Sequence, residues 1–169
     1  MSSSPTARHR HLADDILERA CDLFDSKGYG DTSLQDIADA VGIARPSIYH
    51  YFASKEAILV TIVEGAISTR DDIIAEVRAS DATPDERLRS LLTRVGASTA
   101  HNPAGLRLVL NASAALPNDL RRRDVASRRA MFELMSEVLG VGIDAGLFRP
   151  ADERATAATI IAALTGLQY

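Results

Sequence analysis

The sequence predicts an all-α protein, in which a small N-terminal unit of three helices is joined by one long helix to a C-terminal helical bundle. Apolar residues recur at the i, i+3, i+4, i+7 spacing of one helix face, and the chain carries almost no strand signal. Glycine and proline fall at the breaks between these segments, where helices end and begin. With 169 residues, 46% of them hydrophobic and 25% charged, the chain has the length and composition of a globular protein.

The first two expected helices lie on either side of a glycine-containing loop. An amphipathic helix covers residues 12–27. The second begins at Thr32 or Ser33, either of which can cap it, and Gln35 stands three residues after Thr32 as in a capping box. Gly42 ends this helix, since glycine adopts the left-handed backbone of a helix end at low steric cost. The buried face is expected to consist of Leu34, Ile37, Ala38 and Val41.

The third expected helix begins near Ala44 or Arg45, because Pro46 fits only the first turn, where its missing N–H would have no partner. Ile48 and Phe52 are four residues apart and form its inward face. Its outer surface is rich in Arg, Tyr and His, where a structural helix more often carries Glu, Lys or Ala. Two short helices around a glycine turn are the sequence form of a helix-turn-helix, whose second helix lies in a DNA major groove. The alternative is a solvated two-helix corner.

The rest of the chain is also expected to be helical. A long helix should cover residues 55–79 and end at the polar break that follows it. Thr83, Pro84 and Glu86 mark the start of the next helix, which reaches about residue 100. The further segments expected to be helical are 104–116, 119–145 closing at Gly146, and a last one opened by residues 149–152.

Short motifs between residues 12 and 59 carry a family resemblance. In chain order they are Gly28-Tyr29, Thr32-Ser33, Asp36-Ile37-Ala38, Val41-Gly42-Ile43, Ile48-Tyr49-His50-Tyr51-Phe52 and Ser54-Lys55-Glu56-Ala57-Ile58-Leu59. Together they resemble the DNA-binding domain of the TetR family of bacterial transcriptional regulators. Tyr-x-x-Phe followed by Ser-Lys-Glu is the specific part, typical of the point where the recognition helix ends and a long connecting helix begins. Position 51, where the family often has His, is Tyr in this sequence.

The resemblance implies a helix-turn-helix DNA-binding domain over residues 1–54 and a helical effector-binding and dimerisation domain over residues 55–169. It also implies which residues contact DNA. Hydroxyl and backbone N–H groups of Thr32 and Ser33 would bind phosphates. A cation in the first turn of a helix, as Lys55 would be, suggests a partner anion. The residues expected to meet base edges are Arg45, Pro46, Ser47 and His50, and those expected to hold flanking phosphates are Tyr49, Tyr51 and Lys55.

The charge distribution sets a condition on DNA binding. The formal net charge is −4, and the first 56 residues hold six lysine and arginine residues against nine aspartate and glutamate residues. The usual basic signature of a DNA-binding domain is therefore absent. We expect the attraction to DNA to be local, from an exposed arm over residues 8–11 and from the recognition helix.

Candidate ligand-binding residues come from the C-terminal segments. Apolar residues over 106–110 and 131–135 could line a pocket between helices, with polar anchors beside them. Ordinary core packing is the alternative for the apolar residues. The arginine run over 121–129 is left open between a solvated helix surface and a face for an acidic ligand or partner. The candidates taken from this set are His101, Arg107, Asn111, Met131 and Met135.

The last helix is strongly apolar, with Ile160, Ile161 and Leu164 among its residues, yet the sequence stops at Tyr169. Regulators of the TetR family usually pair their last two helices across a dimer axis. The resemblance therefore implies a homodimer, with one helix of the pair missing or outside the sequence given. A monomeric core helix is the alternative, which the small residues of the segment also permit.

Motifs of known enzyme and metal sites do not occur in the sequence, which has no Gly-rich phosphate loop, HExxH, GxSxG or paired Cys–His spacing. We therefore expect no enzyme, no catalytic residues, no cofactor and no metal. The single cysteine, Cys21, is expected to pack in the first helix and cannot form a disulfide within the chain. With no apolar h-region and no run of membrane-spanning length, the protein is expected to be soluble and cytoplasmic.

These observations predict a DNA-binding transcriptional regulator. In the scheme that the resemblance implies, a repressor sits on a palindromic double-stranded DNA operator as a homodimer. A small-molecule effector then enters the C-terminal domain, displaces the helix over residues 55–79 and releases the operator. The alternative is a helical protein-interaction module whose helix-turn-helix does not read DNA.

Overall fold

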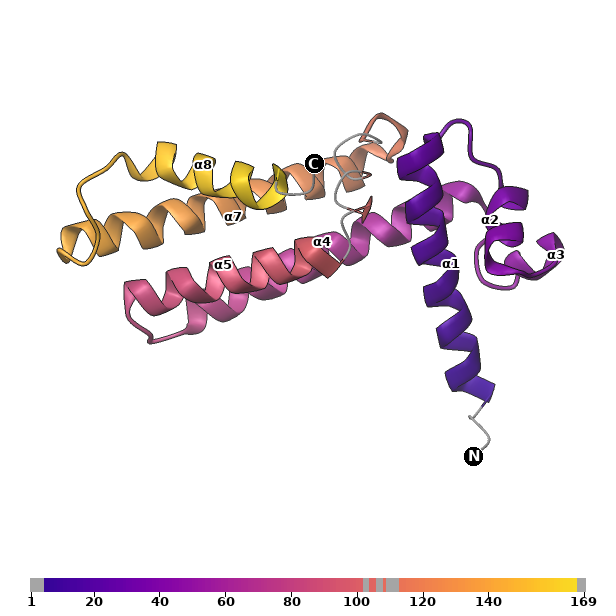
Figure 1. Cartoon of the computed structure of the whole chain (residues 1–169), viewed down its shortest axis with the longest axis horizontal. Helices are drawn as coiled ribbons and strands as arrows, with labels where there is room; N and C mark the ends of the chain where they lie inside the picture. The colour runs from indigo at the N-terminus through magenta and orange to yellow at the C-terminus, as the bar shows by residue number, and fades with distance from the viewer. Residues whose placement is uncertain (1–4, 102–103, 106–107, 109–112, 167–169) are drawn as a thin grey trace. The chain divides into compact units, whose positions relative to one another are not determined.

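The protein, in a computed structural model, is described over residues 5–101, 104–105, 108 and 113–166 (Figure 1). These residues form seven α-helices and one 3-10 turn, and no strand occurs among them, which confirms the all-α prediction. The helices are α1 (Pro5–Lys27), α2 (Leu34–Val41), α3 (Arg45–Ile48), α4 (Lys55–Ala79), α5 (Pro84–His101), α7 (Asn118–Asp144) and α8 (Glu153–Gly166), and the 3-10 turn η1 covers Ser113–Ala115.

The chain divides into two compact units. Residues 1–64 and 104–117 make up the first, and residues 65–103 and 118–169 make up the second. The division therefore falls within α4, and the first turns of this helix belong to the same unit as the helix-turn-helix. The domain boundary expected from the sequence, between residues 54 and 55, lies before the first residue of α4, whereas the division in the structure lies between residues 64 and 65.

Most expected helices match the structure closely. The long helix begins and ends at the expected residues, and Gly146 adopts the left-handed φ of 72° just after α7. Thr83 precedes α5 and donates from its N–H and its Oγ1 to Glu86 Oε2, over 3.0 and 2.9 Å. This contact explains why Thr83 and Glu86 mark the start of a helix.

The structure corrects two of the expected segments, and a third is only partly described. Residues 8–11, expected as an exposed arm, belong to α1, because nothing between Pro5 and residue 12 interrupts a helix and proline suits its first turn. The third helix is shorter than expected and ends at Ile48. The expected helix over 104–116 is described only in part: residues 104, 105 and 108 are helical, and η1 covers residues 113–115.

Buried apolar side chains of the first unit come from α1, α2, α3 and the start of α4. Ile16 of α1, Ile37 of α2 and Ile48 of α3 are each 0% exposed, and they are joined by Ile58 and Leu59 from the start of α4. Cys21 is also buried, as expected. The helix-turn-helix and the start of α4 therefore bury apolar side chains within the same compact unit.

The second unit has its own core, built by α4, α5, α7 and α8. Figure 1 shows α5, α7 and α8 side by side, with α8 running back along α7. Complete burial of residues on three of these helices makes this core the main source of stability in the unit. The buried members are Ile73, Ile74, Val77, Leu91, Met131, Leu134, Met135, Val138, Leu139 and Ala157.

A close approach at the end of α7 gives a stability prediction. A Cβ on Gly142 would overlap the ring of Phe148, which folds back over the helix end. Replacing Gly142 by alanine is therefore expected to lower the free energy of unfolding by about 1–3 kcal/mol, because the ring must leave its place. Urea unfolding would measure this change.

Gly140→Ala is the matched control, two residues earlier on the same helix. A Cβ there would meet only Glu153 Cγ at 3.9 Å, an ordinary contact. This variant should raise the free energy of unfolding by about 0.5–1 kcal/mol, because alanine favours a helix interior over glycine. Equal effects of the two variants would show that helix propensity, and not the Phe148 ring, decides at Gly142.

Candidate nucleic-acid interface

The N-terminus of α2 is closed by an acidic capping box. Ser33 Oγ accepts the N–H of Asp36 over 3.1 Å, and the Ser33 N–H donates to Asp36 Oδ2 over 2.7 Å. The box therefore lies one residue later than the expected pair of Thr32 and Gln35. The physical reason is that Gln35 instead donates to Asp39 on the next turn, over 2.7 Å.

The turn between α2 and α3 follows the prediction. Gly42 has the left-handed φ of 77° and its N–H is directed at the carbonyls of Ala38 and Asp39. Ala44 is extended and acts as the N-cap of α3, with Pro46 in the first turn. Beyond Ile48 the backbone continues as a turn that ends in a bond from the Phe52 N–H to the Ile48 carbonyl, over 2.9 Å. The helix-turn-helix is thus formed by local backbone chemistry.

The two faces of α3 and its following turn differ sharply. Ile48 is 0% exposed and Phe52 9%, which confirms the expected inward face. Tyr49 is 50% exposed, a large exposure for an aromatic residue beside a buried isoleucine. Among the other expected DNA contacts, Arg45, Pro46 and His50 are exposed, and Ser47 and Tyr51 are half-buried.

Thr32 does not present its hydroxyl to the surface. The residue is 1% exposed, and its Oγ1 donates to the carbonyls of Gly28 and Leu23 over 2.8 and 3.2 Å. The hydroxyl of Ser33 likewise donates a hydrogen bond to Asp36 Oδ2, over 2.5 Å. Both hydroxyls are therefore bonded inside the protein, and the expected contacts of Thr32 and Ser33 with DNA phosphates stay predictions.

Lys55 is also bonded to the backbone of its own unit. Its ammonium donates to the carbonyls of Tyr29, Gly30 and Thr32 over 2.6, 3.1 and 2.7 Å. The anion that its place in α4 suggested is replaced by three carbonyl dipoles of the loop between α1 and α2. The expected contact of Lys55 with a DNA phosphate stays a prediction, and a phosphate would have to compete with these three carbonyls.

The other cations of this unit can be sorted by their partners. Lys27 lies 2.9 Å from Asp36, and Arg19 lies 3.6 Å from Asp22. Hydrogen bonds from Ser33 and Lys27 hold the pKa of Asp36 well below its usual range, so this carboxylate stays ionised. Between residues 11 and 64 of the described chain, Arg45 is the one lysine or arginine without a protein partner.

The three candidate ligand residues that the structure describes differ in their exposure. Met131 and Met135 are 6% and 0% exposed and belong to the core of the second unit, while His101 is exposed at the end of α5. Arg107 and Asn111 lie outside the described residues. For the two methionines, the core-packing alternative is the one that agrees with the structure.

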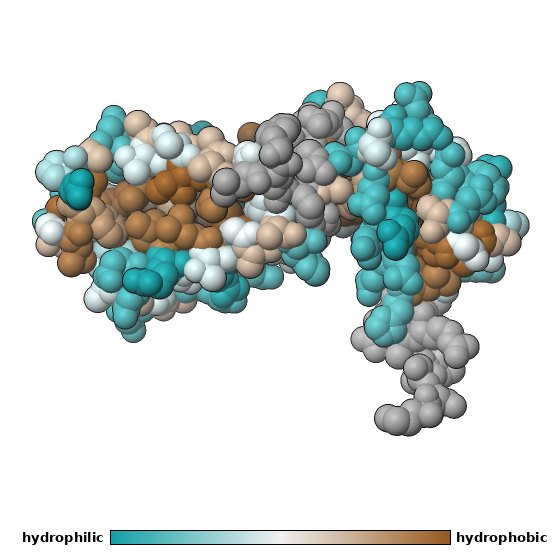
Figure 2. Space-filling view, viewed as in Figure 1, coloured by the Kyte–Doolittle hydropathy of each residue, from teal (hydrophilic) through white to brown (hydrophobic). Residues whose placement is uncertain are grey.

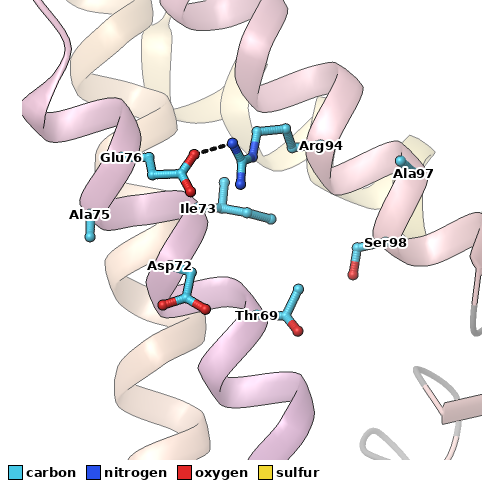
Figure 3. A pocket seen from close by; sticks show the side chains of 8 residues that line it. All are labelled: Thr69, Asp72, Ile73, Ala75, Glu76, Arg94, Ala97 and Ser98. Atoms are coloured by element: carbon cyan, nitrogen blue, oxygen red, sulfur yellow. Dashed lines mark hydrogen bonds and ion pairs between the residues drawn. The ribbon is translucent and has the colours of Figure 1, made fainter.

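A hollow of about 500 Å³ lies between α4 and α5, at residues that the sequence did not single out. Figure 3 shows Arg94 reaching from α5 to the carboxylate of Glu76 on α4, with Asp72 one turn away. Four of the five α4 residues, all except Ala75, follow the i, i+3, i+4, i+7 spacing of one helix face, a signal that could have located them. The lining residues are Thr69, Asp72, Ile73, Ala75, Glu76, Arg94, Ala97 and Ser98.

A buried charged cluster is, after the hollow, the second feature that the sequence did not predict. Asp124 is 1% exposed, and its carboxylate lies 3.3 Å from Arg70 Nη1 and 2.5 Å from Arg128 Nη2. Beside it, Ser127 Oγ donates to Asp71 over 2.6 Å. Burial lowers the pKa of Arg70, an effect that Asp124 opposes. The signal in the sequence was one acidic residue inside the arginine run over 121–129.

The described residues hold neither a candidate metal site nor a candidate membrane span. No group of three or more His, Cys, Asp or Glu side chains gathers there in a way that could hold a metal ion. None of the described helices is both long and apolar enough to cross a membrane.

Comparisons with known proteins agree with this geometry. Residues 16–62 match the family model "Bacterial regulatory proteins, tetR family", and residues 81–169 match "Tetracyclin repressor-like, C-terminal domain". The chain is 30% identical over 137 residues to the HTH-type transcriptional repressor KstR2 of Mycobacterium tuberculosis, covering 80% of this chain and 68% of the relative.

Solved structures show the same likeness. The ketosteroid transcriptional regulator KstR2 of Mycobacterium tuberculosis matches with a TM-score of 0.81 and 26% identity, over 93% of this chain and 82% of that one. The TetR family regulator PfmR from Thermus thermophilus matches with a TM-score of 0.74 and 29% identity, over 90% and 83%.

Proposed function

Because the chain belongs to the TetR family of bacterial transcriptional regulators, we propose that it represses transcription from a palindromic operator, which it binds as a homodimer and leaves when a small-molecule effector binds. The family and its repressor relatives identify the chain as a DNA-binding regulator. The relatives compared are transcriptional regulators rather than enzymes. The effector, the operator and the dimer are the parts proposed.

The observation that carries the proposal is the unpaired guanidinium of Arg45. It stands in the first turn of α3 on the exposed face, while Arg19, Lys27 and Lys55 are engaged by protein groups. In a unit with more acidic than basic residues, a cation without a partner is the group most available to an external anion or to a guanine edge. We propose that Arg45 reads a base and that Tyr49 and His50 beside it contact the flanking backbone or bases.

The phosphate contacts of α2 are proposed to be backbone groups. The hydroxyls of Thr32 and Ser33 are used internally, but the first N–H groups of a helix have no intrahelical partners. Those of Leu34 and Gln35 stand at this end of α2 and are proposed to meet a phosphate. This contact requires no formal charge and therefore fits an acidic chain.

The homodimer is proposed from the apolar surface of the second unit. Figure 2 shows brown, apolar side chains gathered between α5 and α8 in this view, and Val141 and Leu147 are about half exposed. Only Ala157 of α8 is buried, although the helix is rich in isoleucine, leucine and alanine. A second copy covering this surface would remove it from water, and the resulting dimer would carry the two recognition helices that a palindromic operator requires.

Effector release is proposed to act through α4. This helix carries the hollow residues Thr69 and Asp72, and its first turns pack into the core that holds the helix-turn-helix. A hundredfold loosening of the operator requires about 2.7 kcal/mol of coupling between the two sites. A small displacement of α4 that misplaces the recognition helices would supply it.

Selection from random duplex DNA with the purified protein tests the proposal. A palindromic enriched sequence, bound with an affinity that falls steeply as salt rises, is the expected result. Absence of enrichment, together with a protein partner that binds the α3 surface, would instead favour a protein-interaction module.

Arg45→Ala is the sharpest variant for this test. It should weaken binding to the enriched duplex by about 1–3 kcal/mol and relax the preference at one base pair of each half-site. Arg19→Ala removes the same charge from an exposed, paired position on α1 and serves as the control. An Arg45 variant that keeps both the affinity and the base preference would remove this residue from the reading surface.

A further inference from the structure

The ammonium group of Lys55 has no hydrogen left for an external partner. An ammonium carries three N–H donors, and three carbonyl oxygens, of Tyr29, Gly30 and Thr32, lie within 2.6–3.1 Å of Nζ. The ring of Tyr29 covers a further side, with its centroid 4.5 Å from Nζ. A DNA phosphate could bind this group only by displacing one of these contacts.

The three carbonyls belong to the loop that leads into α2. On the other side of this loop, the hydroxyl of Thr32 is bonded to the carbonyls of Leu23 and Gly28 at the end of α1. Ser33, the N-cap of α2, follows directly. The loop is therefore held between the last turn of α1 and the first turn of α4, and it fixes where α2 begins.

We propose that Lys55 is a positioning residue that ties the first turn of α4 to the phosphate-facing end of α2, and that it does not itself neutralise a phosphate. This assignment deepens the proposed function and rests on it for its DNA readout. It also makes the Lys55 contact the place where a shift at the start of α4 would reach the helix-turn-helix.

Two substitutions separate positioning from phosphate binding. Lys55→Arg keeps the charge, and a guanidinium binds phosphate at least as well as an ammonium does. Its planar fork cannot direct hydrogens at three converging carbonyls in the way an ammonium can. Lys55→Met removes the charge and keeps much of the stem. Arg19→Met, which removes an exposed cation from the same unit, is the control for charge alone.

Binding to the selected duplex, measured across salt concentrations, gives the first readout. Both Lys55 variants are expected to lose tenfold or more in affinity, with the salt slope close to that of the unsubstituted protein. A direct phosphate contact predicts the opposite pattern, in which Lys55→Arg binds normally and Lys55→Met lowers the slope by about 0.9. That pattern would overturn the proposal.

Amide hydrogen exchange gives a second readout that needs no DNA. The N–H groups of Ser33 and Asp36 close the capping box, so loosening the loop should speed their exchange in both Lys55 variants. Ala20, buried in α1, should keep its protection, which separates a local change from global unfolding. Unchanged exchange at Ser33 and Asp36 would overturn the proposal. If the unsubstituted protein selects no DNA, the proposed function fails, and the exchange experiment still decides the role of Lys55.

Discussion

Replacing Asp124 by alanine is expected to lower the free energy of unfolding by about 3–5 kcal/mol, the cost of removing one partner from a buried ion pair. The carboxylate is 1% exposed and serves both Arg70 on α4 and Arg128 on α7. The guanidinium of Arg70 is only 15% exposed and would lose its shortest ionic contact. Arg128, at 35%, can turn toward water, which favours the lower end of the range. Urea unfolding followed by circular dichroism would measure the loss.

Glu133→Ala is the matched control for Asp124. Glu133 also lies on α7 and also has two arginine partners, Arg154 at 2.9 Å and Arg129 at 3.8 Å, but its carboxylate is at the surface. Water and salt screen such a pair, so the stability should change little. If both variants lost the same stability, burial of the cluster would not be the cause.

Replacing Met135 by alanine is also expected to lower the free energy of unfolding strongly. This side chain is 0% exposed in the core of the second unit, and deleting it should cost about 2–5 kcal/mol, through lost burial and the cavity that remains. A residue that lined an open ligand pocket would lose much less, because the space it left would already be in contact with solvent. Urea unfolding of the ligand-free protein distinguishes the two.

His101→Ala is the control variant for the replacement of Met135. His101 was a candidate ligand residue like Met135, but it is exposed at the end of α5. Its replacement should leave the unfolding midpoint nearly unchanged, as is usual for surface positions. A Met135 variant as stable as the His101 variant would return Met135 to the list of ligand-lining candidates.

The helices were predictable because their signals are local. The start of α4 at Lys55, its end at Ala79 and the left-handed Gly42 each follow from residues within about one turn, through capping, spacing and backbone sterics. The buried side of α3 was predictable for the same reason, since Ile48 and Phe52 stand one turn apart. The family motifs rest on these same local patterns.

Roles of single polar groups were less predictable. Thr32 and Lys55 belong to the motifs, yet the hydroxyl of one and the ammonium of the other are bonded to the backbone of their own unit. Sequence spacing tells which groups are near along a helix, but it does not tell whether a donor is already satisfied by a distant loop. The same holds for Arg45, because its spacing along the chain does not show that it lacks a protein partner while the other lysine and arginine side chains between residues 11 and 64 of the described chain have one.

The all-α class, the order of the helices and the helix-turn-helix could be read from the amino-acid sequence, because they depend on periodicity and on chain chemistry over a few residues. Which charged groups remain without a partner depends instead on the packing of the helices. Lys55 finds its carbonyls 23–26 positions away and Arg70 meets Asp124 54 positions away. Such contacts depend on how the helices pack, and the packing leaves Arg45 free on α3 while it buries Asp124.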